Sequence, residues 1–264
     1  MFKFGMGPRL GAGYRTRGVV LVWMLLGLAA CGASNPHPVG SYERGVFFAD
    51  QGKDIEAVAA LESYIRKNPT DSLTAEAQYL KGMTYMIMGE YPLAAVEFQI
   101  LRKDYPTSVR VEDALFQEGV AYLEQVGKVQ RDITGAHEAR LHFLKFSQEY
   151  PNSARMPEVV AYMEEISDLM VRKRLEQIKI YKQLRRHEAV AITLDDVLIE
   201  ESGSSYIPDV MWERARAAEK LDDPDTAARM YERLVSEYPD SRYTNKASKA
   251  LRSLNEEEFD EEED

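Results

Sequence analysis

The chain has 264 residues, of which 45% are apolar and 29% are charged, and its formal net charge is −11 at pH 7. A chain of this size can bury an extensive core, and its acidic balance disfavours a nucleic-acid partner, whose phosphates would repel it. Cys31 is the only cysteine. No disulfide can form within one chain, so the fold would not depend on whether the compartment is oxidising.

The first thirty residues are predicted to be a processing signal rather than part of the fold. Four basic side chains precede an apolar run of thirteen residues, 18–30, which is too short to span a bilayer as a permanent helix. The run ends in Leu28-Ala29-Ala30-Cys31. This resembles a bacterial lipobox, in which the bond before the cysteine is cut and the cysteine carries lipid. The alternative is an ordinary signal peptide followed by a chance cysteine.

The residues after the cysteine indicate the membrane and the tether. Gly32 follows Cys31, and the Asp that is associated with inner-membrane retention in enterobacteria is absent from this position. We therefore expect lipidation at Cys31 and anchoring at the periplasmic face of the outer membrane. Residues 32–41 are rich in Gly, Ser, Asn and Pro and have little to bury, so residues 31–41 are expected to form the lipid anchor and a flexible tether.

A helical repeat follows the tether and is clearest at residues 75–106. Its diagnostic residues, at positions 8, 11, 20, 24 and 32 of the 34-residue tetratricopeptide frame, are Gly82, Tyr85, Ala94, Phe98 and Pro106. Gly82 and Ala94 are expected where the two antiparallel helices come closest. The aromatic side chains fill the space beside that contact. Pro106 ends the second helix because it has no N–H to donate.

Three further copies keep these offsets, the middle one with eight extra residues between its helices. They are Gly45, Phe48, Ala57, Leu61 and Pro69; Gly119, Tyr122, Ala139, Phe143 and Pro151; and Ala215, Ala218, Ala227, Tyr231 and Pro239. A degenerate copy is expected at about residues 172–201. In it Ala189 keeps its place, while Gln177 and Glu201 replace the small residue and the proline.

These copies predict an all-α fold, a right-handed superhelix (α-solenoid) of about five tetratricopeptide repeats over residues 42–254. Residues 156–186 keep a helical pattern without glycine, as one long helix or as two abutting helices. Residues 241–254 are predicted to be the capping helix that covers the last repeat. Residues 255–264 are nearly all acidic, and mutual repulsion should keep them disordered.

The leading helices of the first three repeats predict a groove for a substrate peptide. Their inward residues, expected to line the concave surface, are Tyr42, Val46, Tyr79, Met83, Met86, Phe116, Val120 and Leu123. Aromatic and methionine side chains suit an adaptable peptide site, because thioethers repack at little cost. The alternative is that these residues form the core between repeats.

A basic stretch at residues 172–186 predicts a docking surface for a folded, acidic partner. The residues expected to dock this partner are Arg172, Arg174, Lys179 and Arg185. The alternative is that acidic residues of the expected partner helix neutralise the stretch within the repeat. These acidic residues are Asp195, Asp196, Glu200 and Glu201.

The sequence contains no pattern that predicts an enzyme, a metal site or a cofactor. The histidines, expected at the surface, are His37, His137, His142 and His187. None of them forms a pair at the i,i+4 spacing that binds zinc on a helix, and no cysteine joins them. Adjacent carboxylates point about 100° apart on a helix and share no site. A non-enzymatic adaptor is therefore the favoured class.

The lipobox, the short tether and the five repeats together resemble the BamD family of outer-membrane lipoproteins. The segments similar to that family's helix-ending signature are Tyr105-Pro106-Thr107-Ser108, Tyr150-Pro151-Asn152-Ser153 and Tyr238-Pro239-Asp240-Ser241. The insertion in the third repeat, with Arg131-Asp132 before its second helix, is also similar. The resemblance covers roughly residues 28–254, and the acidic tail lies outside it.

The resemblance implies a scaffold of the β-barrel assembly complex. Its N-terminal repeats would bind unfolded outer-membrane β-barrel proteins, and its C-terminal repeats would hold the BamA-like barrel subunit, alongside other assembly lipoproteins. No binding residue of the family matches closely enough to be transferred singly. The alternative is a tetratricopeptide adaptor lipoprotein of another envelope system, serving cell-wall maintenance, secretion or motility.

Overall fold

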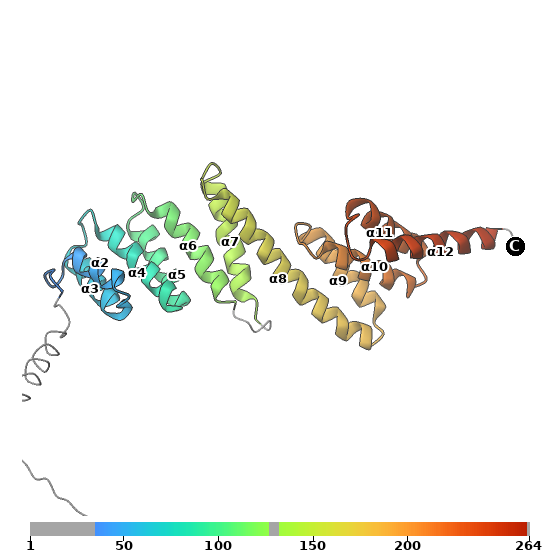
Figure 1. Ribbon diagram of the computed structural model, residues 1–264, viewed down its shortest axis with the longest axis horizontal. Helices are drawn as coiled ribbons and strands as arrows, with labels where there is room; N and C mark the ends of the chain where they lie inside the picture. The colour runs from blue at the N-terminus through green and yellow to red at the C-terminus, as the bar shows by residue number, and fades with distance from the viewer. Residues whose placement is uncertain (1–34, 127–131, 263–264) are drawn as a thin grey trace, which may run out of the picture.

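The computed structural model describes residues 35–126 and 132–262, which form an elongated array of helices (Figure 1). The described residues contain eleven helices and no strand. In chain order the helices are α2 (Tyr42–Asp50), α3 (Asp54–Lys67), α4 (Thr74–Met88), α5 (Tyr91–Asp104), α6 (Val111–Glu124), α7 (Thr134–Glu149), α8 (Met156–Gln183), α9 (His187–Glu200), α10 (Ile207–Glu219), α11 (Pro224–Glu237) and α12 (Thr244–Glu262). None of them is both long and apolar enough to cross a membrane.

Successive helices pair as hairpins, which confirms the predicted α-solenoid of tetratricopeptide repeats. The five repeats are α2–α3, α4–α5, α6–α7, α8–α9 and α10–α11, and α12 packs on α11. Four of the five second helices end two residues before a proline, namely Pro69, Pro106, Pro151 or Pro239. Because proline cannot continue the hydrogen-bond ladder, these helices stop at the same point of the repeat.

Each of the first three leading helices has a glycine where it packs on the second helix of its repeat. Because glycine has no side chain, the two helices can approach closely there. A Cβ added to Gly82 would lie 2.7 Å from the Phe98 ring, and one added to Gly45 would lie 2.5 Å from Leu61. The sequence predicted that Gly82 faces Ala94, but the side chain that occupies the space over Gly82 is that of Phe98, which is fully buried. Glycine is therefore required for packing at these helical positions.

The structure corrects the register of the fourth repeat by one residue. The C-cap of α9 is Glu201, and the C-cap of α5 is Tyr105. Counting back equally from these two caps places Val190, which is 1% exposed, at the position of Ala94. Ala189 is only partly buried. The prediction that Ala189 is the counterpart of Ala94 was therefore wrong. It arose because an alanine lies next to the correct residue, Val190.

The same correction changes the other two positions of the frame in this repeat. Ile178, which is 2% exposed, occupies the position of the glycine, and Ser202 occupies that of the proline. Gln177, which the sequence analysis placed there, instead donates a hydrogen bond from Nε2 to the Tyr181 hydroxyl at 2.7 Å. Ile178 packs in one core with Leu194. Two medium-sized aliphatic side chains thus share the space that glycine and phenylalanine fill in the second repeat.

Helix α8 is a single helix of 28 residues, which settles the choice between one helix and two for residues 156–186. The residue in the glycine position lies eight residues after the first residue of α4 and α6, but twenty-two residues after that of α8. The fourteen extra residues correspond to about 21 Å of helix. The fourth repeat is therefore displaced along its leading helix relative to the third.

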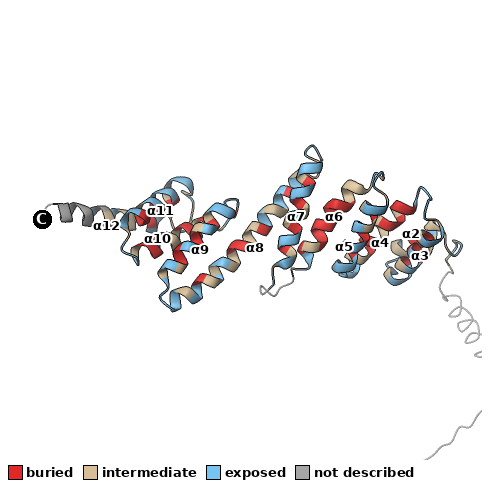
Figure 2. Cartoon of the chain, turned by 180° about the vertical axis from the view of Figure 1, so that it is seen from behind, coloured by how far each residue is buried: buried red, intermediate tan, exposed pale blue. Residues whose placement is uncertain are grey.

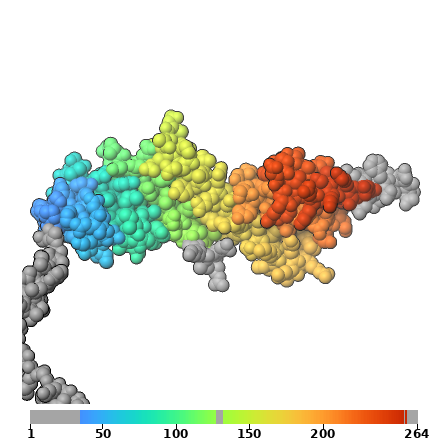
Figure 3. All heavy atoms as spheres, in the orientation of Figure 1, coloured from blue at the N-terminus to red at the C-terminus, as the bar shows by residue number. Residues whose placement is uncertain are grey.

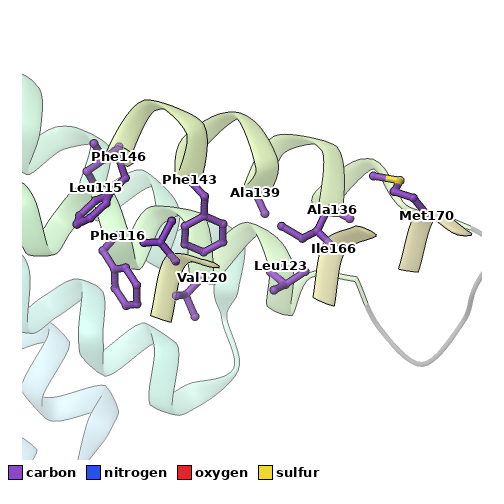
Figure 4. Close-up of a cluster of buried hydrophobic side chains, with 11 residues drawn as sticks. Leu115, Phe116, Val120, Leu123, Ala136, Ala139, Phe143, Phe146, Ile166 and Met170 are labelled. Carbon is purple, nitrogen blue, oxygen red and sulfur yellow. The ribbon is translucent and has the colours of Figure 1, made fainter. Parts of the chain in front are cut away.

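The two parts of α8 belong to different hydrophobic cores. Val159, Ile166 and Met170 pack on α6 and α7, as Figure 4 shows for the last two, whereas Val171 and Ile178 pack on α9 and α10. Buried residues consequently occur along the length of α8 (Figure 2). We call the region where these two cores meet the joint.

The ends of the array differ in part from expectation. Asn35 donates from Nδ2 to the Arg44 carbonyl at 3.3 Å, and Arg44 donates from Nη1 to the His37 carbonyl at 2.9 Å. Residues 35–41 of the expected tether therefore contact α2. At the other end, α12 continues to Glu262, into the acidic segment expected to be disordered, and glutamate is itself a good helix former. The signal segment and Cys31 lie outside the described residues.

Replacement of Gly82 by Val should destabilise the fold by about 1–3 kcal/mol, because the added methyl groups would overfill the contact with Phe98. Thermal and urea unfolding followed by circular dichroism would measure the change. Gly203→Ala is the control, since a Cβ there meets no atom within 4 Å. A second change, Phe98→Leu, should restore part of the lost stability, and an unchanged midpoint for Gly82→Val would contradict the packing described.

Candidate protein-interaction surfaces

The residues predicted to form a peptide groove divide between an accessible and a buried set. Phe116 is 2% exposed, Val120 8% and Leu123 7%. Figure 4 shows these three side chains in the core that α6 shares with α7 and α8. They are therefore inaccessible to a ligand in this conformation, and for them the alternative of an inter-repeat core holds. The partly exposed set is Tyr42, Val46, Tyr79, Met83 and Met86.

Arginines from the turns between repeats cover two aromatic rings of the leading helices. The Arg110 guanidinium lies 4.9 Å from the Tyr79 ring centre, and that of Arg155 lies 4.6 Å from the Phe116 ring centre. Each arginine is the fourth residue after a helix-ending proline. The sequence analysis missed this contact, although the equal spacing of the two arginines from Pro106 and Pro151 was visible.

These arginines are neutralised within the protein. Arg110 donates to Glu76 through Nε at 2.6 Å and Nη2 at 2.8 Å, and these bonds raise its pKa. Asp113 accepts from Arg110 at 3.0 Å and from Arg155 at 2.7 Å. Burial raises the pKa of the Tyr79 hydroxyl, and the nearby Asp113 carboxylate adds to this. The surface over Tyr79 is thus a polar network on an aromatic base.

The four basic residues predicted to dock a partner lie in three different places. Arg172 and Lys179 line a cavity of about 400 Å³ between α8, α10 and the start of α12. Arg174 lines a cavity of about 350 Å³ on the α7 and α9 side of the helix. Arg185 lies in the turn between α8 and α9. The predicted surface is therefore not one continuous patch.

The acidic residues expected to neutralise the basic stretch have other partners or remain exposed. Asp195 accepts from Arg214 at 2.7 Å, and Glu201 accepts from Arg140. Asp196 and Glu200 are exposed, and Glu200 lines the same cavity as Arg174. Within the basic stretch, Glu176 accepts from Lys179 at 2.5 Å, and Glu213 accepts from Lys182 at 2.6 Å.

Two polar contacts hold the joint. Arg140 of α7 donates from Nη1 and Nη2 to the two carboxylate oxygens of Glu201 at 2.8 and 2.6 Å. On α8, Asp168 accepts from the Ser204 hydroxyl at 2.7 Å and from the Ser205 N–H and hydroxyl at 2.8 Å each. Burial alone would raise the pKa of Asp168, but the bonds from Ser204 and Ser205 leave it below its usual value.

One histidine expected at the surface is instead largely enclosed. The His142 ring stacks on Tyr122 at 4.9 Å, and its Nε2 lies 3.5 Å from the Glu118 carboxylate. Burial, together with the charges of Arg102 and Lys145, lowers the pKa of His142 to about 4. Among the described residues, no three His, Cys, Asp or Glu side chains are grouped so that they could hold a metal ion.

Breaking the Arg140–Glu201 pair should cost about 3 kcal/mol, because Arg140→Met leaves a carboxylate that is 7% exposed without its partner. Urea unfolding would measure this loss. The control is Lys145→Met on the same helix, which removes an exposed pair with Glu149 and should cost less than about 1 kcal/mol. Equal losses for the two variants would show that the joint does not depend on the buried pair.

Two family models match parts of this chain. A family model described as outer membrane lipoprotein (YfiO) matches residues 85–208, and a tetratricopeptide-repeat model matches residues 209–241. No curated protein matches the chain. A thermophilic tetratricopeptide-repeat protein of Thermus thermophilus is 16% identical, with a TM-score of 0.34, over 78% of this chain and 95% of its own. The Naa15/Naa10 complex bound to HypK-THB is also 16% identical, with a TM-score of 0.33, over 90% of this chain and 36% of that one. From α4 to the end of α11, the chain is thus similar to a BamD-like outer membrane lipoprotein family and to tetratricopeptide repeats.

Proposed function

We propose that the protein is an outer-membrane lipoprotein scaffold of the β-barrel assembly complex. It binds unfolded outer-membrane β-barrel proteins and a BamA-like barrel subunit, together with other assembly lipoproteins, so that the barrels are inserted into the membrane. The observation that carries this proposal is the match of residues 85–208 to an outer membrane lipoprotein family within an array of five repeats. The lipobox that ends at Cys31 supports anchoring at the periplasmic face.

The substrate surface in this proposal is the partly exposed row on the leading helices of the first two repeats. Tyr79, Met83 and Met86 of α4 pack on the core of the second repeat while retaining accessible surface. An extended segment from the end of a barrel protein carries alternate apolar side chains, which need apolar contacts on one side. Phe116, Val120 and Leu123 support this row from the core and are not contacts.

The partner surface in this proposal is the 400 Å³ cavity of the C-terminal half. Arg172 and Lys179 supply positive charge there, and Tyr206 and Tyr243 supply aromatic surface. The Arg172 guanidinium lies 6.0 Å from the centre of the Tyr206 ring. A folded domain with an acidic projection matches this chemistry, since its charge would be steered over roughly the 8 Å Debye length of physiological salt.

Loss of apolar contact on α4 should weaken binding of a synthetic barrel-strand peptide. We expect Tyr79→Ala combined with Met83→Ser to raise the Kd at least tenfold, which fluorescence anisotropy would measure. The control is Ile87→Ser, an exposed apolar residue of the same helix that is not in the predicted row. Circular dichroism would verify that the fold is retained. A peptide affinity that is indifferent to the double change would assign both residues to the core alone.

Purification of the native protein from detergent-solubilised membranes tests the partner. We expect a β-barrel assembly subunit in the eluate, and we expect Arg172→Glu with Lys179→Glu to reduce its recovery. Arg66→Glu with Lys67→Glu, on the exposed end of α3, is the matched control. Cell-wall or secretion components in the eluate would favour an adaptor of another envelope system instead. A Cys31→Ala variant that still incorporates radiolabelled palmitate would contradict the lipid anchor.

A further inference from the structure

The end of α8 and the start of α9 form a projection whose outer residues are exposed to solvent. It is seen at the lower edge of the molecule in Figures 1 and 3. Two aliphatic side chains on it face solvent, Ile180 at 58% and Leu184 at 64% exposure. Arg185 and Arg186 follow and are also exposed. We call residues 180–186 the hairpin tip.

The arginines of the hairpin tip lack an acidic partner, unlike Lys179 and Lys182 of the same helical hairpin. Lys182 pairs with Glu213, as described above. Among the described residues, no carboxylate lies within ion-pair distance of Arg185 or Arg186. Glu188, on the first turn of α9, is exposed and is the only acidic residue close to them in the sequence. The hairpin tip is thus a small basic surface on a chain whose net charge is negative.

The backbone at the hairpin tip is in an unfavourable conformation for the residue it carries. Arg185 has φ of +53°, as does Asp222 in the corresponding turn of the fifth repeat, whereas the first two repeats have glycine there, Gly52 at +65° and Gly89 at +74°. A residue with a Cβ is disfavoured in this left-handed region, and arginine has no side chain that relieves it locally. Glycine would relieve this conformation, so the left-handed φ at Arg185 costs the fold some stability.

We propose that the hairpin tip contacts an anionic phospholipid surface. Exposed aliphatic side chains next to unpaired arginines are the combination that binds membrane interfaces, where the aliphatic groups enter the headgroup boundary and the cations meet lipid phosphates. A protein-binding hot spot would more typically use aromatic residues with arginine, and leucine is under-represented there. Tyr181 is the one aromatic residue of the hairpin tip, and its hydroxyl is occupied by the hydrogen bond from Gln177.

The acidic net charge of the chain should restrict the membrane contact to the hairpin tip. The formal net charge is −11, so most of the surface would be repelled by anionic lipid. A protein held at a membrane by its N-terminus would therefore touch the bilayer preferentially at the hairpin tip, which would fix the orientation of the array. This inference requires neither the lipid on Cys31 nor any assembly partner.

The test uses a chain from residue 32 onward, which retains every described helix, held on vesicles through an N-terminal histidine tag and nickel-chelating lipid. A Gln183→Cys change adds the only cysteine of this chain, and it carries an environment-sensitive fluorophore. The vesicles contain phosphatidylethanolamine and phosphatidylglycerol, or phosphatidylcholine alone, with a quencher on the lipid headgroup. The same label at Thr107→Cys, an exposed position in a turn between repeats, is the control.

We expect strong quenching at residue 183 on vesicles with phosphatidylglycerol and little at residue 107. Arg185→Glu with Arg186→Glu should reduce the contact equilibrium by about fivefold or more for each arginine, and Ile180→Ser with Leu184→Ser should also reduce it. Arg66→Glu with Lys67→Glu should leave it unchanged. Arg185→Gly should raise the melting temperature while weakening the contact, which a purely structural role would not produce.

Three results would overturn the proposal. The first is equal quenching at residues 183 and 107. The second is quenching that does not depend on the anionic lipid or on the arginines. The third is a label at residue 183 that lipid never quenches but that a purified partner protein shields, which would make the hairpin tip a protein-docking element. Because no assembly partner is present in the vesicle assay, failure of the proposed scaffold function would leave its result unaffected.

Discussion

The fold depends on one recurring contact, in which a residue of the leading helix faces a residue of the second helix across a space of fixed size. Gly82 and Phe98 make it in the second repeat, and Ile178 and Leu194 occupy the same positions in the fourth. The two pairs differ in how the volume is divided between the helices, and Phe98, Ile178 and Leu194 are all buried. The rest of each repeat is arranged around this contact, because it determines how closely the two helices approach.

Helix α8 turns a uniform array into two connected segments. Its first part completes the core of the third repeat, where Tyr162 stacks on Phe143 at 5.2 Å with an interplanar angle of 4°. Its second part serves as the leading helix of the fourth repeat. One continuous helix therefore contributes residues to both cores. The Arg140–Glu201 and Asp168–Ser204 contacts then hold the angle on two sides of the joint.

The two segments present different chemistry to a ligand. In the N-terminal segment, arginines cover Tyr79 and Phe116 and are bound by carboxylates, so the accessible surface consists of paired charges beside partly exposed thioethers. In the C-terminal segment, Tyr243 occupies the position that these arginines have in their repeats, and its ring stacks on Trp212 at 5.3 Å. The lysines and arginines of α8 border this segment. An adaptor that binds an apolar peptide at one end and a charged domain at the other is consistent with this division.

The sequence alone predicted four of the five repeats and the end of the second helix in each of these four. These depend on local features, namely the spacing of small and aromatic residues and the prolines that stop four second helices, and such features act within one repeat. It did not determine which inward residues stay accessible. Phe116, Val120 and Leu123 have the same periodicity as Tyr79 and Met83, but they are buried in the core that α6 shares with α7 and α8. The register of the fourth repeat and the partner of Glu201 were likewise decided by tertiary contacts, since Arg140 is 61 residues away in the chain. A periodic pattern indicates which side of a helix is apolar, whereas only the packed structure shows what covers that side.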